Sequence, residues 1–144
     1  MFNGKTIVII DDELSILKSF KKWFNKSCPE NDIFIYNEYS PLCITSDVDA
    51  VIIDFYLGRN ITAPELIKEM RESYPDLLII ATSGAFVLED QEVTCYNNEI
   101  MVECMESGAT RVSPKNTDNI VDILSKHFTI RDAKNLLEQT GIVR

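Results

Sequence analysis

Short apolar runs alternate along this chain with segments of helical length, and this alternation restricts the fold more than any other feature. The runs at residues 6–10, 50–53 and 77–81 are β-branched or aliphatic and too short for buried helices, so we expect strands there. Residues 33–36 and 109–113 favour two further strands. This order predicts an α/β fold in which right-handed crossovers join parallel strands and helices cover both faces of the sheet.

Apolar residues at helical spacing mark the segments between the strands. The first helix should end near Pro29, and its apolar face consists of Leu14, Leu17, Phe20 and Phe24. Residues 41–46 are poorly marked and favour a short helix or a loop. A similar apolar face after the last strand predicts a helix around residues 120–128.

Two more helices are marked by their ends. Residues 62–65, Thr-Ala-Pro-Glu, have the S/T-x-x-E form of a capping box, so a helix should begin near Ala63. Gly108 is well placed to end another helix. The connection before that helix, residues 86–98, is longer and more polar than such units need. We expect an extra helical turn or a mobile loop there.

Composition narrows the class of protein. The 144 residues suggest one domain, and the net charge of -9 gives no general attraction for nucleic acid. The four cysteines show no C-x-x-C spacing, and His127 is the only histidine, so reduced structural thiols are expected. No apolar run approaches the ~20 residues of a membrane span. We therefore expect a soluble cytoplasmic protein with neither a membrane nor nucleic acid as direct partner.

Polar side chains follow the ends of the predicted strands. Asp11, Asp12, Asp54, Ser83 and Lys115 each come just after an apolar run. In an open parallel sheet the carboxyl ends of the strands meet at one edge, where ligands bind. Three carboxylates, a hydroxyl and an ammonium group should therefore share one cleft.

These side chains form a set suited to phosphoryl chemistry. Two adjacent acids and a third nearby make a hard oxygen site of the kind that Mg²⁺ prefers. A carboxylate can also accept a phosphoryl group, whose oxygens a lysine and a hydroxyl can then bind. Each residue alone could have a purely structural role, because acids after a strand often cap the next helix and lysines usually lie in solvent. Their joint order is what favours function.

The segments IVIIDDE, VIIDFYLG, IIATSGA and GATRVSPK resemble, in this order, the receiver domain of two-component response regulators. The resemblance implies a flavodoxin-like fold with a five-stranded parallel sheet in the order 2-1-3-4-5. It covers residues 6–128, and we expect a receiver domain over residues 1–128. Residues 129–144 would form a C-terminal extension with a short helix.

The resemblance also assigns roles in the cleft. It implies that Asp54 is the phosphoacceptor and that Asp11 and Asp12 hold Mg²⁺, together with Asp54 and the backbone carbonyl of Tyr56. Of the two acids after the first strand, Asp12 is the favoured direct ligand. Lys115 matches the lysine that binds the phosphoryl group.

The hydroxyl that responds to phosphorylation in the family precedes a small residue. Ser83, followed by glycine, fits this pattern better than Thr82. The chain departs from the family at three positions, where Gly58 and Asn116 replace prolines and Val112 replaces an aromatic residue. An aromatic ring cannot report phosphorylation at position 112.

The function implied is Mg²⁺-dependent phosphoryl transfer to Asp54 from a sensor histidine kinase, a phosphotransfer protein or a small phosphodonor. A conformational change would then signal to a downstream protein target, and a homodimer is possible. Such a protein is a regulator that catalyses only its own phosphoryl transfer and dephosphorylation. A haloacid dehalogenase-type phosphatase is disfavoured because residues 54–56 lack its D-x-D motif. The alternative is a receiver-like interaction module that does not depend on phosphorylation.

Overall fold

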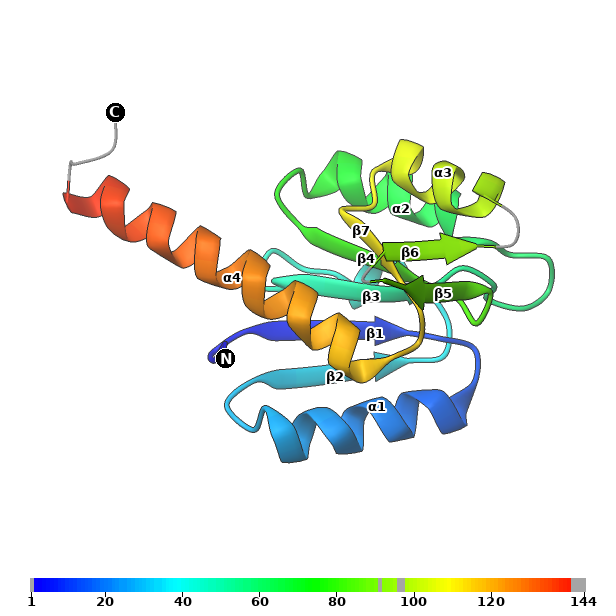
Figure 1. Ribbon diagram of the computed structural model, residues 1–144, viewed down its shortest axis with the longest axis horizontal. Coiled ribbons are helices and arrows are strands. Elements are labelled where there is room, and N and C mark those ends of the chain that lie inside the picture. The colour runs from blue at the N-terminus through cyan, green and yellow to red at the C-terminus, as the bar shows by residue number, and fades with distance from the viewer. Residues whose placement is uncertain (1, 91, 96–97, 141–144) are drawn as a thin grey trace.

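Five parallel strands form the central sheet (Figure 1). The computed structural model describes residues 2–90, 92–95 and 98–140. The strands lie in the order β2-β1-β3-β4-β7, so that β7 takes the fifth place, and the predicted order 2-1-3-4-5 and α/β class are confirmed. The five strands are β1 (Thr6–Ile10), β2 (Asp32–Tyr36), β3 (Ala50–Asp54), β4 (Leu78–Thr82) and β7 (Arg111–Ser113).

Helices cover both faces of this sheet, as predicted. α1 (Leu14–Ser27) and α4 (Thr117–Thr140) bury their apolar residues with Ile7 and Ile9 of β1. α2 (Ala63–Ser73) and α3 (Asn98–Ser107) pack on the opposite face with Val8 and Ile10. Successive strand residues point to opposite faces, so the unbroken apolar strands supply two cores at once.

The poorly marked second connection contains one short 3-10 helix, η1 (Pro41–Cys43). α2 begins at Ala63 as predicted, but the expected capping box is wrong, because the Thr62 side chain at the N-cap makes no cap hydrogen bond. Gly108 follows α3 with φ +117°, a conformation that favours glycine. Its carbonyl accepts hydrogen bonds from the Arg71 guanidinium at 3.0 and 2.9 Å, which ties α2 to the end of α3.

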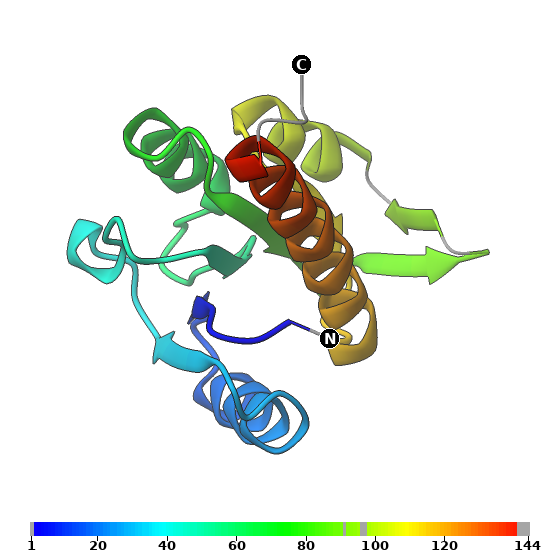
Figure 2. The ribbon, with the colours of Figure 1, turned by 90° about the vertical axis from the view of Figure 1, so that its left-hand side faces the viewer.

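The connection before α3 contradicts the expectation of a helical turn or a mobile loop. It contains an antiparallel hairpin of β5 (Phe86–Glu89) and β6 (Glu92–Cys95), which projects from the body of the protein (Figure 2). Two cross-strand pairs, Val87 with Thr94 and Leu88 with Val93, explain it, because β-branched and aliphatic pairs favour strands. Residues 91, 96 and 97 of the predicted connection lie outside the described residues.

The C-terminal extension differs from the prediction as well. We expected a short separate helix after Phe128, but α4 continues without a break to Thr140. Residues 117–140 contain neither glycine nor proline, so nothing in this stretch ends the helix. The boundary predicted at residue 128 therefore falls inside a helix, and residues 141–144 lie outside the described part. Among the helices of the described residues, none is both long and apolar enough for a membrane span.

Candidate functional site

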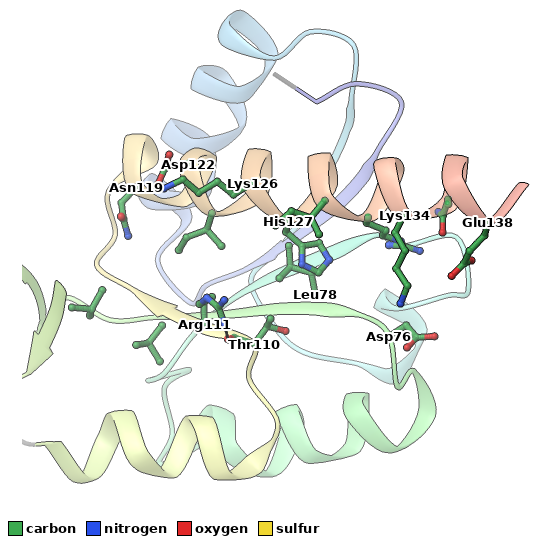
Figure 3. A pocket seen from close by; sticks show the side chains of 16 residues that line it. Asp76, Leu78, Thr110, Arg111, Asn119, Asp122, Lys126, His127, Lys134 and Glu138 are labelled. Carbon is green, nitrogen blue, oxygen red and sulfur yellow. Dashed lines mark hydrogen bonds and ion pairs between the residues drawn. The ribbon is translucent and has the colours of Figure 1, made fainter. Parts of the chain in front are cut away.

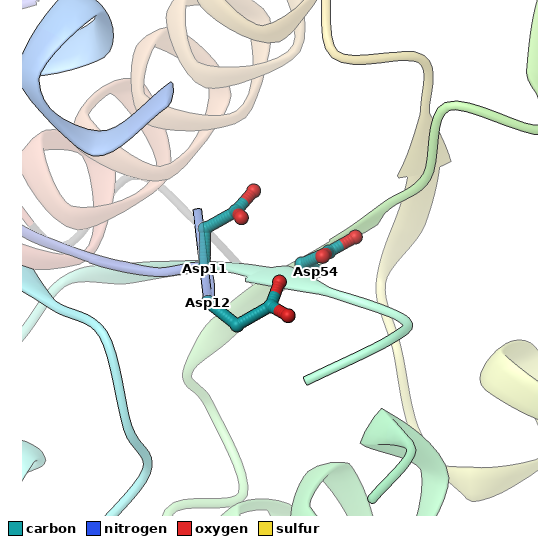
Figure 4. A group of neighbouring side chains, drawn as sticks. All are labelled: Asp11, Asp12 and Asp54. Carbon is teal, nitrogen blue, oxygen red and sulfur yellow. The ribbon is translucent and has the colours of Figure 1, made fainter. Parts of the chain in front are cut away.

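The predicted site residues lie at the carboxyl edge of the sheet. Asp11 and Asp12 directly follow β1, Asp54 is the last residue of β3, and Lys115 lies two residues beyond β7. Ile10 of β1 pairs with Ile53 of β3, so this register places the acids that follow side by side. Figure 4 shows the three aspartate side chains as neighbours at this edge of the sheet.

The carboxylates lie close enough to share a ligand. Asp11, Asp12 and Asp54 each offer an oxygen within 4.8 Å of the others. Lys115 Nζ lies 2.9 Å from Asp11 Oδ2 and 3.4 Å from Asp54 Oδ2. Asp11 and Asp54 are buried, at 2% and 5% exposed, whereas Asp12 is exposed. The site is thus a partly open acidic cluster with one ammonium group at its inner side.

Burial and like charge make the Asp54 carboxylate unfavourable in this cluster. Desolvation is the largest cause and repulsion from Asp11 the second, and together they raise the pKa of Asp54 to about 7 from its ordinary value of 3.8. Lys115 opposes the shift through its charge and its hydrogen bond, and Asp12 adds to it. A cation bound among these acids would therefore favour the ionised form of Asp54.

Lys115 and Asp11 also hold one another in place. Burial disfavours the charge of Lys115, but hydrogen bonds and attraction from Asp11 and Asp54 outweigh it and raise the pKa of Lys115. Asp11 Oδ1 accepts a hydrogen bond of 2.9 Å from the backbone N–H of Glu13. Asp11 thus accepts a hydrogen bond at the start of α1 with one oxygen and binds Lys115 with the other. It therefore has a structural role in the helix start and a place in the acidic cluster.

A small divalent cation fits the donors of this cluster. Mg²⁺ prefers oxygen ligands and is usually bound through one or two carboxylates, with water completing its octahedron. The loop after β3 leaves room beside Asp12, because a Cβ built on Gly58 would lie 3.3 Å from Asp12 Oδ2. Gly58 has φ +76°, and Arg59 and Asn60 follow with φ 48° and 62°, so this loop turns tightly. The exposed Tyr56 lies at the start of the loop and bridges to Thr62.

Two hydroxyls lie at the end of β4, beside Asp54. Thr82 pairs with Asp54 in the sheet register, and its Oγ1 donates to the Ile53 carbonyl at 3.4 Å. Ser83 Oγ accepts from the backbone N–H of Ala85 at 3.1 Å, and the Ser83 carbonyl accepts from Phe86 N–H at 3.2 Å. Ser83 therefore ties the start of the hairpin to β4. The register of Thr82 against Asp54 was not apparent from the sequence, because it depends on where β4 ends.

Comparisons with known proteins agree with this architecture. No known sequence family matches the chain, and no curated protein matches it in sequence. Solved structures do match in fold. A CheY-like response regulator receiver domain protein from Methanospirillum hungatei superposes with a TM-score of 0.70 at 19% identity, over 90% of this chain and 98% of that one.

Two further solved structures show the same similarity. The signal receiver domain of a putative LuxO repressor protein from Vibrio parahaemolyticus has a TM-score of 0.71 at 14% identity, covering 93% of this chain and 97% of that one. A response regulator protein from Burkholderia pseudomallei, solved with a phosphorylated aspartic acid, a calcium ion and citrate, has a TM-score of 0.66 at 14% identity. That match covers 97% of this chain and 88% of that one. The chain therefore has the fold of response regulator receiver domains.

Proposed function

We propose that this chain is a phosphoacceptor receiver that takes a phosphoryl group on Asp54 in a Mg²⁺-dependent reaction. The observation that carries the proposal is the placement of three carboxylates within 4.8 Å of one another at the strand ends, with Lys115 bridging Asp11 and Asp54. The fold supports it, because a response regulator protein of similar fold was solved with a phosphorylated aspartic acid. The expected donors are a histidine kinase, a phosphotransfer protein or a small phosphodonor.

The reaction needs Asp54 as a carboxylate. One of its oxygens attacks the phosphorus of the donor, so that an O–P bond forms while the bond from phosphorus to the donor's oxygen or nitrogen breaks. The donor leaves with the electrons of the broken bond. Hydrolysis of the resulting aspartyl phosphate by water returns the free carboxylate and inorganic phosphate, which makes the protein a regulator that resets itself.

Asp11, Asp12 and Asp54 would hold the cation, with the Tyr56 carbonyl as a further ligand. When bound, Mg²⁺ supplies positive charge that offsets the repulsion among the acids and the charge of the transferring phosphoryl group. Lys115 already pairs with Asp54, so it can pair with a phosphoryl oxygen after transfer without a long movement. Burial of Asp54 limits access of water to the acyl phosphate.

A hydroxyl of β4 would report the phosphorylated state. Ser83 is the predicted switch, and its movement toward Asp54 would break its bond to Ala85 N–H at the root of the hairpin. Thr82 is the alternative, supported by its register opposite Asp54. In both cases the change passes to the hairpin and α3, because Val112 offers no aromatic ring to reorient.

The second candidate is an interaction module that does not use phosphorylation. Val112 and Asn116 favour it, since both depart from the receiver pattern close to Lys115. The two functions differ in one respect that can be measured directly: only a phosphoacceptor gains mass from a phosphodonor.

Intact mass spectrometry after incubation with acetyl phosphate and Mg²⁺ tests the proposal. The wild-type chain should gain one phosphoryl group, and Asp54→Asn should gain none. Asp47→Asn, which alters an exposed aspartate, is the matched control and should be labelled like the wild type. Equal labelling of Asp54→Asn would move the acceptor elsewhere. Failure of the wild type to label with acetyl phosphate or phosphoramidate, with Mg²⁺ bound, would favour the interaction module.

A further inference from the structure

Lys115 lies on a short link between the end of β7 and the start of α4. β7 ends at Ser113 and α4 begins at Thr117, so few residues separate the strand from the helix. The Lys115 side chain is only 16% exposed, and its ammonium group is held between two carboxylates of the acidic cluster. Ordering so flexible a side chain costs entropy, and a fixed backbone at its base lowers that cost. What holds this link in place therefore bears on what Lys115 can do.

The register of the sheet fixes the strand end of the link. Ser113 pairs with Thr82, and Thr82 pairs with Asp54, so the three residues form one row across β7, β4 and β3. Ser113 is fully buried, at 0% exposed. Pro114 and Lys115 follow the last pair of this ladder, so other contacts must place them.

Hydrogen bonds to one carbonyl hold the peptide group that precedes Lys115. The Pro114 carbonyl accepts the backbone N–H of Asn116 at 2.7 Å and the hydroxyl of Ser113 at 2.8 Å. The first of these bonds joins residues two apart and closes a γ-turn with Lys115 at its centre. The backbone from which the Lys115 side chain starts is thus bonded on both sides.

Asn119 connects the same link to the first turn of α4. Its side-chain Nδ2 donates to Ser113 Oγ at 2.7 Å, and its backbone N–H donates to Asn116 Oδ1 at 3.1 Å. The second bond is that of a helix N-cap, with Asn116 as the capping residue. Asn119 is also the first α4 residue that lines the groove between this helix and β7 (Figure 3). Ser113, Asn116 and Asn119 thus form a clamp around Lys115.

We propose that this clamp directs the Lys115 ammonium group into the acidic cluster, so that its three members are positioning residues. Asn116 stands where the receiver pattern has a proline, which would fix one backbone angle directly after the lysine. The hydrogen bonds of the clamp supply rigidity at this point by other means. The effect on phosphoryl transfer rests on the function proposed above, whereas the placement of Lys115 can be tested without it.

Acylation of lysines by acetic anhydride, measured by peptide mass spectrometry on the metal-free protein, tests the placement. Lys115 of the wild type should react more slowly than the exposed Lys18. Asn119→Ala should raise this ratio about fivefold, the change expected when one hydrogen bond between neutral groups is lost. Asn135→Ala, the same change on the exposed outer part of α4, should leave it unchanged. Lys5, 17% exposed and paired with Asp132, should stay slow in every variant that remains folded.

Two isosteric variants of Ser113 separate the hydroxyl from the packing around it. Ser113→Thr and Ser113→Val add the same volume to a buried position, but only threonine keeps the hydroxyl. Lys115 should react at least about fivefold faster in the valine variant than in the threonine variant, because only valine removes hydrogen bonds of the clamp. Equal rates in this pair, or an unchanged ratio in Asn119→Ala, would overturn the proposal.

Labelling of Asp54 by acetyl phosphate and Mg²⁺ tests the consequence for phosphoryl transfer. Asn119→Ala should lower the labelling rate at saturating donor about fivefold, in proportion to the release of Lys115. In a Lys115→Met background the same substitution should cause no further loss, because the clamp acts through the lysine. Faster acylation with an unchanged labelling rate would overturn the role of the clamp in transfer. A wild type that is not labelled would refute the proposed function, and the acylation ratios would still decide whether the clamp places Lys115.

Discussion

Replacing Asp54 with asparagine should stabilise the metal-free protein, and the gain should depend strongly on pH. The pKa of Asp54 is raised from 3.8 to about 7, so the folded protein binds a proton at pH 5 that the unfolded chain has released. The stability contributed by this proton is present at low pH and is lost as the pH rises through 7. At pH 5, two units below a pKa of 7, this proton adds about 3 kcal/mol to the free energy of unfolding, at 1.36 kcal/mol per unit. At pH 8 it adds almost nothing.

The Asp54→Asn variant has no titrating group at this position. The difference in unfolding free energy, variant minus wild type, should therefore be larger by about 3 kcal/mol at pH 8 than at pH 5. Urea unfolding in EDTA, followed by Trp23 fluorescence, measures this difference. Subtracting the two proteins at each pH cancels the titration of the other groups.

Asp47→Asn provides the matched control, because it removes an exposed carboxyl group outside the cluster. Its difference from wild type should stay constant within about 0.5 kcal/mol across the same range, as is usual for surface substitutions. If the Asp54→Asn difference were also constant with pH, the carboxylate would not be disfavoured in the folded state. The electrostatic account of the site would then be wrong.

Three further predictions concern the cation, the switch and the scaffold. Asp12→Ala should weaken Mg²⁺ binding at least about tenfold in calorimetry, because it removes a ligand from a small oxygen set; unchanged affinity would place the cation elsewhere. Beryllofluoride, a phosphoryl mimic, should alter hydrogen exchange over residues 84–104 in the wild type and in Thr82→Val, but not in Ser83→Ala; the reverse result would make Thr82 the switch. Arg71→Met should destabilise the fold by about 2–3 kcal/mol in urea unfolding, because the Gly108 carbonyl loses two charge-assisted hydrogen bonds. A loss below 0.5 kcal/mol would show that water replaces them.

The main sheet was predictable because its central strands, β1, β3 and β4, are buried on both faces. Runs such as residues 50–53 and 77–81 contain no polar residue. Strands of this kind are typical of a parallel sheet that is covered by helices on both faces. The carboxyl edge follows from the same reasoning, since every parallel strand ends on the same side. Asp11, Asp54 and Lys115 were therefore located before any distance between them was known.

The hairpin and the long C-terminal helix were not predictable by the same means. The strands of the hairpin are short, and their outward face carries glutamates, so the segment has the composition of a loop. Its structure depends on cross-strand pairs such as Leu88 with Val93, which a reading along the chain does not bring together. In α4 the apolar pattern weakens after Phe128, yet the helix continues because no residue stops it. The weaker apolar pattern after Phe128 therefore marks where the burial of α4 ends, not where the helix ends.

The acidic cluster bears on the choice between the two candidate functions. Holding Asp54 ionised between Asp11 and Asp12 destabilises the folded chain near neutral pH, and Lys115 offsets the repulsion only in part. A docking module gains nothing physical from this arrangement, since Asp54 is buried and offers no surface to a partner. A phosphoacceptor needs it, because the clustered negative charge that causes this repulsion also attracts a divalent cation. Once the cation is bound, Asp54 is left as a reactive carboxylate. The energetic penalty of the site and its chemistry thus have a single cause, and that cause favours phosphoryl transfer over docking alone.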